Sequence, residues 1–89
     1  MLDLAVHKAF AKDLKRAGLN PTNTAKLFLY ISLLLEEKTL PAEARDHALS
    51  GNYSDTREFH ISGDLLVVYR IEAETLELLR IGTHAQLFK

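Results

Sequence analysis

The sequence predicts an α+β domain in which two N-terminal helices pack on one face of a mainly antiparallel sheet. Residues 7–37 have the apolar spacing of helices, whereas three segments between residues 57 and 81 are rich in residues that favour strands. The connections between these segments are very short, and short connections make neighbouring strands antiparallel. With 89 residues, the chain is expected to form a single domain, residues 1–89, around one core.

Alternating apolar residues at positions 1–6 predict a short edge strand at the start of the chain. The period changes at His7, after which Phe10, Leu14 and Ala17 fall on one face of a first helix. Gly18 is suited to the position just past the end of this helix, because glycine adopts the left-handed conformation without steric cost.

Four cations follow one stripe of this helix, at positions i, i+4, i+7 and i+8: Lys8, Lys12, Lys15 and Arg16. A charged stripe is typical of a solvated helix face. It is equally suited to binding a row of phosphates, and the affinity would then fall steeply with salt concentration. The spacing is compatible with both interpretations.

Asn20 and Pro21 predict the start of a second helix, because asparagine caps helices well and proline fits the first helical position. This helix is expected to run to about Glu37. It is apolar nearly all round, through Leu27, Phe28, Leu29, Tyr30, Ile31, Leu33, Leu34 and Leu35. Two surfaces must cover such a helix, and we expect the sheet and the first helix to do so unless part of it docks a partner.

The second half of the chain is predicted to supply the sheet. A connector at residues 39–45 has room for one helical turn, and residues 46–56 are predicted as mostly loop. Strands are expected at residues 57–61, 65–72 and 75–81, and a small strand or turn at residues 85–88. The run LLVVY in the middle strand is typical of a central strand that is covered on both faces. The predicted order is β-α-α-β-β-β.

Composition excludes several classes of protein. The chain has no cysteine, so it has neither a disulfide nor a thiolate metal site. The longest apolar run is too short to span a membrane, and the N-terminus lacks the features of a signal peptide, so we expect a cytoplasmic protein. Averaged over the whole molecule, the net charge of -1 argues against binding to nucleic acid. However, residues 1–35 carry five lysines and arginines against two aspartates, which leaves a local basic surface.

Three histidines and one aspartate in the C-terminal half are candidates for a catalytic site: His47, His60, Asp64 and His84. Histidine both accepts and donates protons near neutral pH, so a nuclease without metal would need several such groups together. A tight turn would bring His60 close to Asp64, and the antiparallel strand order can place His84 at the same edge. No cofactor is expected, because the P-loop, the dinucleotide glycine pattern and the GxSxG elbow are all absent.

Each candidate also has a structural interpretation. His47 and His60 would be bonded to the backbone, Asp64 would be an ordinary turn residue, and His84 would cap the final segment. Zinc is the competing explanation for clustered histidine and aspartate, although their spacing matches no strong metal signature. His7, at a helix start, is interpreted as an ordinary surface residue.

Three blocks of the sequence, DHALSGNY, REFHIxGDLLVVY and LLRIGTHAQLF, closely resemble the YafQ-type toxins of the RelE/ParE superfamily, the ribonucleases of bacterial toxin–antitoxin systems. The blocks cover most of residues 46–88, whereas the N-terminal part resembles the superfamily only in the order of its elements. The resemblance implies a RelE-like fold and an mRNA interferase. Such an endoribonuclease cuts mRNA in the A site of the 70S ribosome without metal, and a cognate antitoxin neutralises it.

The resemblance also implies which residues form the site: His47, His60, Asp64, His84 and Phe88. In the implied reaction a base takes the proton of the ribose 2'-OH, the oxygen attacks the adjacent phosphorus, and an acid protonates the departing 5'-oxygen. We interpret His84 as the acid and His60 as the base, with Asp64 orienting an imidazole or acting as the base itself.

Further residues are expected to bind RNA. His47 and Arg57 would stabilise phosphate charge, and Phe88 would stack on or position a nucleotide. Contacts to rRNA would come from the cationic stripe of Lys8, Lys12, Lys15 and Arg16, together with the arginines.

Two positions near the site depart from the family pattern. Gly63 stands where relatives often have proline, which loosens the turn that orients Asp64. Leu65 stands where some have tryptophan, so an aromatic that touches a base is missing. Two other classes remain open on the same fold: a ParE-like toxin that inhibits gyrase, and a catalytically inactive interaction module. The clustered histidines disfavour the ParE-like class.

Overall fold

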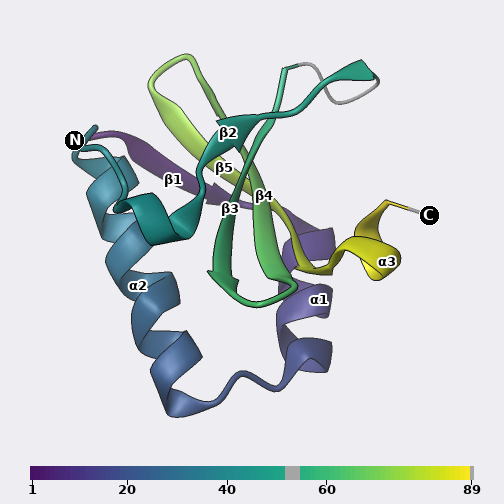
Figure 1. Cartoon of the computed structure of the whole chain (residues 1–89). Coiled ribbons are helices and arrows are strands. Elements are labelled where there is room, and N and C mark those ends of the chain that lie inside the picture. The colour runs from purple at the N-terminus through teal and green to yellow at the C-terminus, as the bar shows by residue number, and fades with distance from the viewer. Residues whose placement is uncertain (52–54, 89) are drawn as a thin grey trace.

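A computed structural model of the chain describes residues 1–51 and 55–88, and every structural statement below refers to them. The elements are β1 (Asp3–Val6), α1 (Lys8–Ala17), α2 (Pro21–Leu35), the 3-10 helix η1 (Ala42–Ala44), β2 (His47–Ala48), β3 (Arg57–Ser62), β4 (Leu65–Glu72), β5 (Thr75–Thr83) and α3 (His84–Leu87). The strands form one sheet in the order β1-β5-β4-β3-β2 (Figure 1). β1 pairs parallel with β5 and the other neighbours pair antiparallel, which confirms the predicted α+β class.

The N-terminal strand and the first helix lie where the sequence places them. β1 is an edge strand, and Gly18 ends α1 in the left-handed conformation, with φ 56°. The predicted buried face of α1 is wrong in one respect, since Leu14 is 36% exposed and the buried residues are Phe10 and Asp13. The helix packs on β5, and this packing brings Asp13 rather than Leu14 against the sheet.

Asp13 is buried because β5 supplies partners for its carboxylate. Arg80 donates from Nε and Nη2 at 2.6 and 3.1 Å, and the backbone N–H of Ile81 donates at 3.1 Å. Burial opposes ionisation of Asp13, but these hydrogen bonds outweigh it and hold its pKa below the usual value. The pair therefore joins α1 to β5 through a charged contact that sequence periodicity does not reveal.

We expect Asp13→Asn to destabilise the fold by about 2 kcal/mol, because hydrogen bonds to a charged group contribute roughly this much. Urea unfolding at neutral pH measures the effect. Because the pKa of Asp13 is lowered in the folded state, its contribution is present at neutral pH and lost as the pH falls. The difference between the variants should therefore shrink in acid. Asp3→Asn, at an exposed position, is the control, and an equal loss from it would contradict the assignment.

The second helix begins as predicted, with the Asn20 side chain accepting a hydrogen bond from the backbone N–H of Asn23 at 2.7 Å. It ends at Leu35 rather than Glu37, because Glu37 takes a left-handed conformation with φ 58°. Within the described part of the chain, no helix combines the length and apolar character that crossing a bilayer requires.

The expectation for α2 is confirmed for the sheet and wrong for the first helix, which does not cover the other side of α2. One face is buried against the sheet, through Leu27, Tyr30 and Leu34. On the other face Phe28 is 66% exposed and Leu29 is 51% exposed. The first helix packs mainly on β5, and the exposed side of α2 is compatible with the alternative expectation, a surface that docks a partner.

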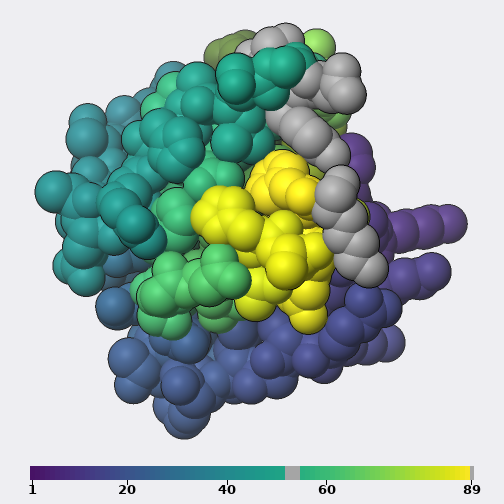
Figure 2. Space-filling view, turned by 45° about the vertical axis from the view of Figure 1, so that its right-hand side comes forward, coloured from purple at the N-terminus to yellow at the C-terminus, as the bar shows by residue number. Residues whose placement is uncertain are grey.

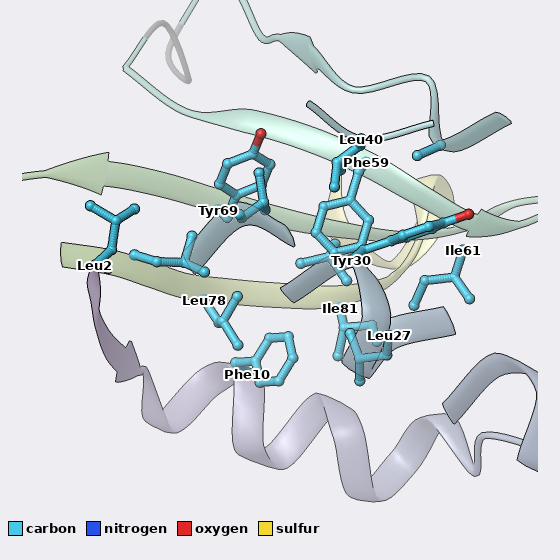
Figure 3. Close-up of a cluster of buried hydrophobic side chains, with 14 residues drawn as sticks. Leu2, Phe10, Leu27, Tyr30, Leu40, Phe59, Ile61, Tyr69, Leu78 and Ile81 are labelled. Atoms are coloured by element: carbon cyan, nitrogen blue, oxygen red, sulfur yellow. The ribbon is translucent and has the colours of Figure 1, made fainter. Parts of the chain in front are cut away.

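The main core fills the space between the sheet and the two long helices. Figure 3 shows Phe10 of α1 and Tyr30 of α2 directed toward side chains of the strands, among them Phe59 and Leu78. The rings of Tyr30 and Phe59 meet edge to face with centroids 5.6 Å apart, an arrangement that aromatic pairs favour. Burial of these apolar side chains fixes α1 and α2 on the same face of the sheet.

β4 is the middle strand, and both of its faces are buried, as its apolar run predicts. Val67 and Tyr69 belong to the main core, whereas Leu66 and Val68 join a second cluster with Leu87 of α3 on the opposite face. The same alternation applies to β3, which pairs with β4. Because Phe59 faces the main core, its neighbours Glu58 and His60 point to the other face, where α3 lies.

The segments around this second face are only partly predicted by the sequence. The helical turn in the connector is present as η1, but the two-residue strand β2 lies within the predicted loop, of which residues 52–54 fall outside the described residues. The final segment is the short helix α3 rather than a strand or turn. Thr83 and Gln86 form a capping box at its start, with each side chain bonded to the backbone N–H of the other.

Candidate active site

Four elements bring the candidate residues together. Residues His47 of β2 and Glu58 of β3 are direct partners in the sheet, and His60 lies two residues further along the same face of β3. The pairing of Leu65 with Thr83 places the start of α3, and so His84, beside the turn between β3 and β4. The three imidazoles, which are far apart in the sequence, therefore meet at one end of the sheet.

A buried carboxylate lies at the centre of these imidazoles. Glu58 is 2% exposed, and its Oε2 lies 3.3 Å from Nε2 of His47, 3.6 Å from Nε2 of His60 and 3.4 Å from Nε2 of His84. Glu58 is not among the residues predicted from the sequence. The strand period could have found it, because residues i and i+2 of a strand share a face and Glu58 precedes His60 by two.

His84 is held by Asp64. Its Nδ1 donates to Oδ1 of Asp64 at 2.9 Å, and its backbone N–H donates to the same oxygen at 3.3 Å. The hydrogen bond that His84 donates to Asp64, more than the nearby charge of Glu58, raises the pKa of His84. The same bond and the one from the backbone N–H of His84 lower the pKa of Asp64. The bond at Nδ1 leaves Nε2 as the nitrogen that can exchange a proton with a substrate.

His60 lies below the surface between the other two histidines. It is 7% exposed, and its ring centroid lies 6.3 Å from that of His47 and 5.6 Å from that of His84. Within the described part of the chain its Nδ1 is buried without a hydrogen-bond partner. Burial, followed by the charge of Arg45, lowers the pKa of His60, so the ring is neutral at neutral pH.

His47 and Phe88 complete the cluster at the surface. The side chain of His47 is 52% exposed, and its Nδ1 donates to the backbone carbonyl of Arg45 at 2.6 Å. This bond fixes the tautomer, so that Nε2 is the basic nitrogen of the neutral ring. The ring of Phe88 packs against that of His84 with centroids 5.8 Å apart.

A cavity of about 280 Å³ opens above this cluster and is lined by His47, Leu49, Ser50, Glu58, His84 and Phe88. Figure 2 shows this part of the surface, where the C-terminal residues in yellow lie next to the teal η1–β2 region and the green β3–β4 turn. Both exposed imidazoles thus meet solvent in one hollow whose floor carries a carboxylate. A polar hollow of this kind, with groups that exchange protons near neutral pH, can support acid–base chemistry.

Arg57, a predicted phosphate-binding residue, lies elsewhere. It points to the opposite face of the sheet, like Phe59, and its Nε donates to Asp46 at 3.2 Å and to the hydroxyl of Tyr69 at 3.3 Å. Its charge is compensated there, so the prediction for this residue is corrected. The four cations of the α1 stripe are all exposed, on the helix that covers the other face of the sheet.

Three groups of the cluster are also arranged as metal ligands would be. One ligand atom each of Glu58, His60 and His84 lies within 4.8 Å of the other two. One carboxylate and two imidazoles are a donor set that suits zinc and copper. The donor chemistry therefore fits a divalent ion as well as acid–base work.

Fold and site together define the class: an α+β domain with two long helices on one face of a five-stranded sheet and an imidazole–carboxylate cluster at one end of that sheet. The sequence profile described as "Bacterial toxin of type II toxin-antitoxin system, YafQ" matches residues 2–89. The chain therefore belongs to the YafQ family of bacterial type II toxins, as the three sequence blocks indicate.

Similar proteins agree with this assignment along the whole chain. The mRNA interferase toxin YafQ of Escherichia coli K12 is 32% identical over 87 residues, which are 97% of this chain and 95% of that protein. The crystal structure of a metal-bound toxin from Helicobacter pylori has a TM-score of 0.88 at 38% identity, covering 99% of this chain and all of the other. YafQ in the crystal structure of the E. coli DinJ–YafQ complex has a TM-score of 0.87 at 31% identity, with both chains fully covered.

Proposed function

We propose that this chain is a toxin that cleaves mRNA on the ribosome, acts in the cytoplasm, and is neutralised by a cognate antitoxin. The observation that carries this proposal is the meeting of His47, His84 and Glu58 in one cavity, with Asp64 behind His84. The E. coli relative named as an mRNA interferase, and the solved complex of YafQ with DinJ, support the substrate and the kind of partner.

The proposed reaction needs one base and one acid. His47 takes the proton of the ribose 2'-OH through Nε2, and the 2'-oxygen forms a bond to the adjacent phosphorus. The bond from phosphorus to the 5'-oxygen breaks at the same time, and His84 gives that oxygen its Nε2 proton. The products are a 2',3'-cyclic phosphate and a 5'-hydroxyl.

The base is assigned to His47 rather than to His60, the residue expected from the sequence. His47 lines the cavity and is half exposed, whereas His60 is buried behind Glu58 and is not among the described residues that line the cavity. An in-line displacement also needs its base and acid on different sides of the phosphorus. His47 on β2 and His84 on α3 approach the Glu58 carboxylate from separate elements, which suits that requirement.

Glu58 acts as a positioning residue for both imidazoles. We expect Glu58→Gln, which keeps the shape but removes the charge, to slow cleavage about ten- to hundredfold, the usual effect of losing a group that orients reacting residues. Because the charge of Glu58 helps to raise the pKa of His84, an NMR titration of the His84 ring should also move to lower pH. Glu58→Asp keeps the charge and is the matched control. An unchanged titration in the glutamine variant would count against this role.

Binding of RNA is assigned to two further parts of the chain. Phe88, beside His84 in the wall of the cavity, is placed to stack on a nucleotide. The exposed stripe of Lys8, Lys12, Lys15 and Arg16 would contact phosphates of rRNA.

A metal is not needed for this reaction, but the site fits one. Glu58, His60 and His84 would hold a divalent ion, which would polarise a phosphate oxygen as a Lewis acid. Such an ion would occupy the same nitrogen of His84 from which the proposed proton transfer starts, so metal binding and acid catalysis compete for this residue.

The proposal is tested by mapping the 5' ends of mRNA after brief expression of the chain. Cuts in frame with translation are expected, and they should disappear when translation is blocked or when His84 is replaced by Gln. Toxicity with intact mRNA and inhibited gyrase would identify a ParE-like toxin instead. Absence of both toxicity and cleavage in the unaltered chain would identify an inactive interaction module.

A further inference from the structure

Arg45 spans two sides of the candidate active site. Its backbone carbonyl accepts the hydrogen bond that orients His47, at 2.6 Å. Its guanidinium reaches the turn between β3 and β4, where Nη2 donates to the carbonyl of Gly63 at 3.4 Å. Gly63 directly precedes Asp64, the residue that holds His84. Arg45 therefore connects the segment that carries the base with the turn that supports the acid.

The guanidinium of Arg45 is available to bind an anion, unlike the guanidinium groups of three other arginines. Arg57, Arg70 and Arg80 are each paired with a carboxylate, of Asp46, Glu77 and Asp13 respectively. The guanidinium of Arg45 is exposed and forms no ion pair with a carboxylate of residues 1–51 and 55–88. Its hydrogen bond there is with the neutral carbonyl of Gly63. Arginine offers five donors in a planar fork, so most of its hydrogen-bonding capacity remains unused.

The site needs a cation of this kind. Two carboxylates, Glu58 and Asp64, lie within it, and both repel a phosphodiester that approaches His47 and His84. The residue expected from the sequence to neutralise phosphate, Arg57, faces the other side of the sheet.

We propose that the guanidinium of Arg45 binds an RNA phosphate at the edge of the cavity and so forms a phosphate-binding subsite beside His47 and Asp64. The inference rests on the proposed ribonuclease function and adds a substrate contact to it. Bidentate contact between a guanidinium and a phosphate would fix the strand relative to the two imidazoles.

The experiment measures nucleotide binding without the ribosome. Adenosine 3'-monophosphate is titrated into the full chain while the histidine ring signals are followed by NMR, for the wild type, Arg45→Asn and Arg45→Lys. Asparagine tolerates the left-handed backbone of this position, φ 48°, so the substitution removes the charge without backbone strain. We expect Arg45→Asn to weaken binding about ten- to hundredfold, as for other charged hydrogen bonds, and Arg45→Lys to retain part of the affinity.

Lys38→Gln, which removes an exposed cation that lies outside the site and pairs with Glu36, is the matched control and should bind the nucleotide like the wild type. In ribosome assays Arg45→Asn should raise KM more than it lowers kcat. The lost contact weakens binding of the substrate and of the transition state about equally, so the barrier between the two changes little. Equal nucleotide affinity of Arg45→Asn and wild type, or no ring shifts in the wild type at saturating nucleotide, would overturn the subsite. Absence of mRNA cleavage by the wild type on ribosomes would instead overturn the ribonuclease assignment, so the two failures are distinguishable.

Discussion

Replacement of His84 by Gln is expected to slow mRNA cleavage on programmed ribosomes by roughly 10² to 10⁴, the contribution of a positioned proton donor. The imidazole is 50% exposed in the cavity, and Asp64 fixes it through Nδ1, which leaves Nε2 for the departing 5'-oxygen. Glutamine has a similar reach but cannot deliver a proton. Single-turnover rates measure the chemical step directly, and circular dichroism shows whether the variant is folded.

The pH dependence distinguishes proton donation by His84 from a structural role. The pKa of His84 is raised, first by the hydrogen bond to Asp64, so the ring keeps its proton to a higher pH than a free histidine. Cleavage by the wild type should therefore fall as the pH rises through that raised pKa. Asp64→Asn removes the main cause of the shift, so the alkaline limb of its profile should move to lower pH. A limb that stays in place in Asp64→Asn would contradict the assignment of His84 as the acid.

Replacement of His47 by Gln is expected to reduce the cleavage rate by roughly 10² to 10⁴ as well, since it removes the proposed base. His60→Gln should reduce the cleavage rate much less, by about tenfold. This is the lower end of the effect expected when a group that supports the reacting residues is lost. The physical reason is that His60 is buried and neutral at neutral pH, so its replacement by a neutral amide removes no charge from the site.

The comparison between these two variants decides which histidine is the base. Both are measured in the same single-turnover assay, with His7→Gln as the control because His7 lies outside the cluster and pairs with Glu77 at 3.0 Å. If His60→Gln loses more activity than His47→Gln, the base is the residue expected from the sequence. A change in His7→Gln of similar size would show that the assay reports folding rather than chemistry.

Much of the fold follows from local sequence. The cap at Asn20 and Pro21, the glycine that ends α1, and the short connections between β3, β4 and β5 place these elements nearly where they are found. These signals are local, because a cap or a turn depends on residues only a few positions apart. Errors arise where packing outweighs periodicity, as at Asp13, whose carboxylate takes the buried position expected for Leu14.

The sequence named the histidines and Asp64 as candidates for the site, but it did not predict how they are arranged. The alternation of β3 predicts a shared face for Glu58 and His60, yet a glutamate in a strand is usually a solvent-facing residue. Only the pairing of β2 with β3, and of β5 with β4, shows that three imidazoles surround this carboxylate. The same pairing places Arg57 on the wrong face to serve the site and Arg45 next to it.

The class of fold, the order of most elements and the residues capable of proton transfer can be predicted from the sequence, because these depend on residue chemistry and short-range spacing. Which of those residues meet depends on the three-dimensional arrangement of the strands and helices. Contacts between His47, Glu58 and His84 depend on strand register and on the helical turn at the C-terminus, and register is set by long-range burial of apolar faces rather than by neighbouring residues. For this reason the central position of Glu58 among the three imidazoles, and the position of Arg45 beside them, emerge only from the fold.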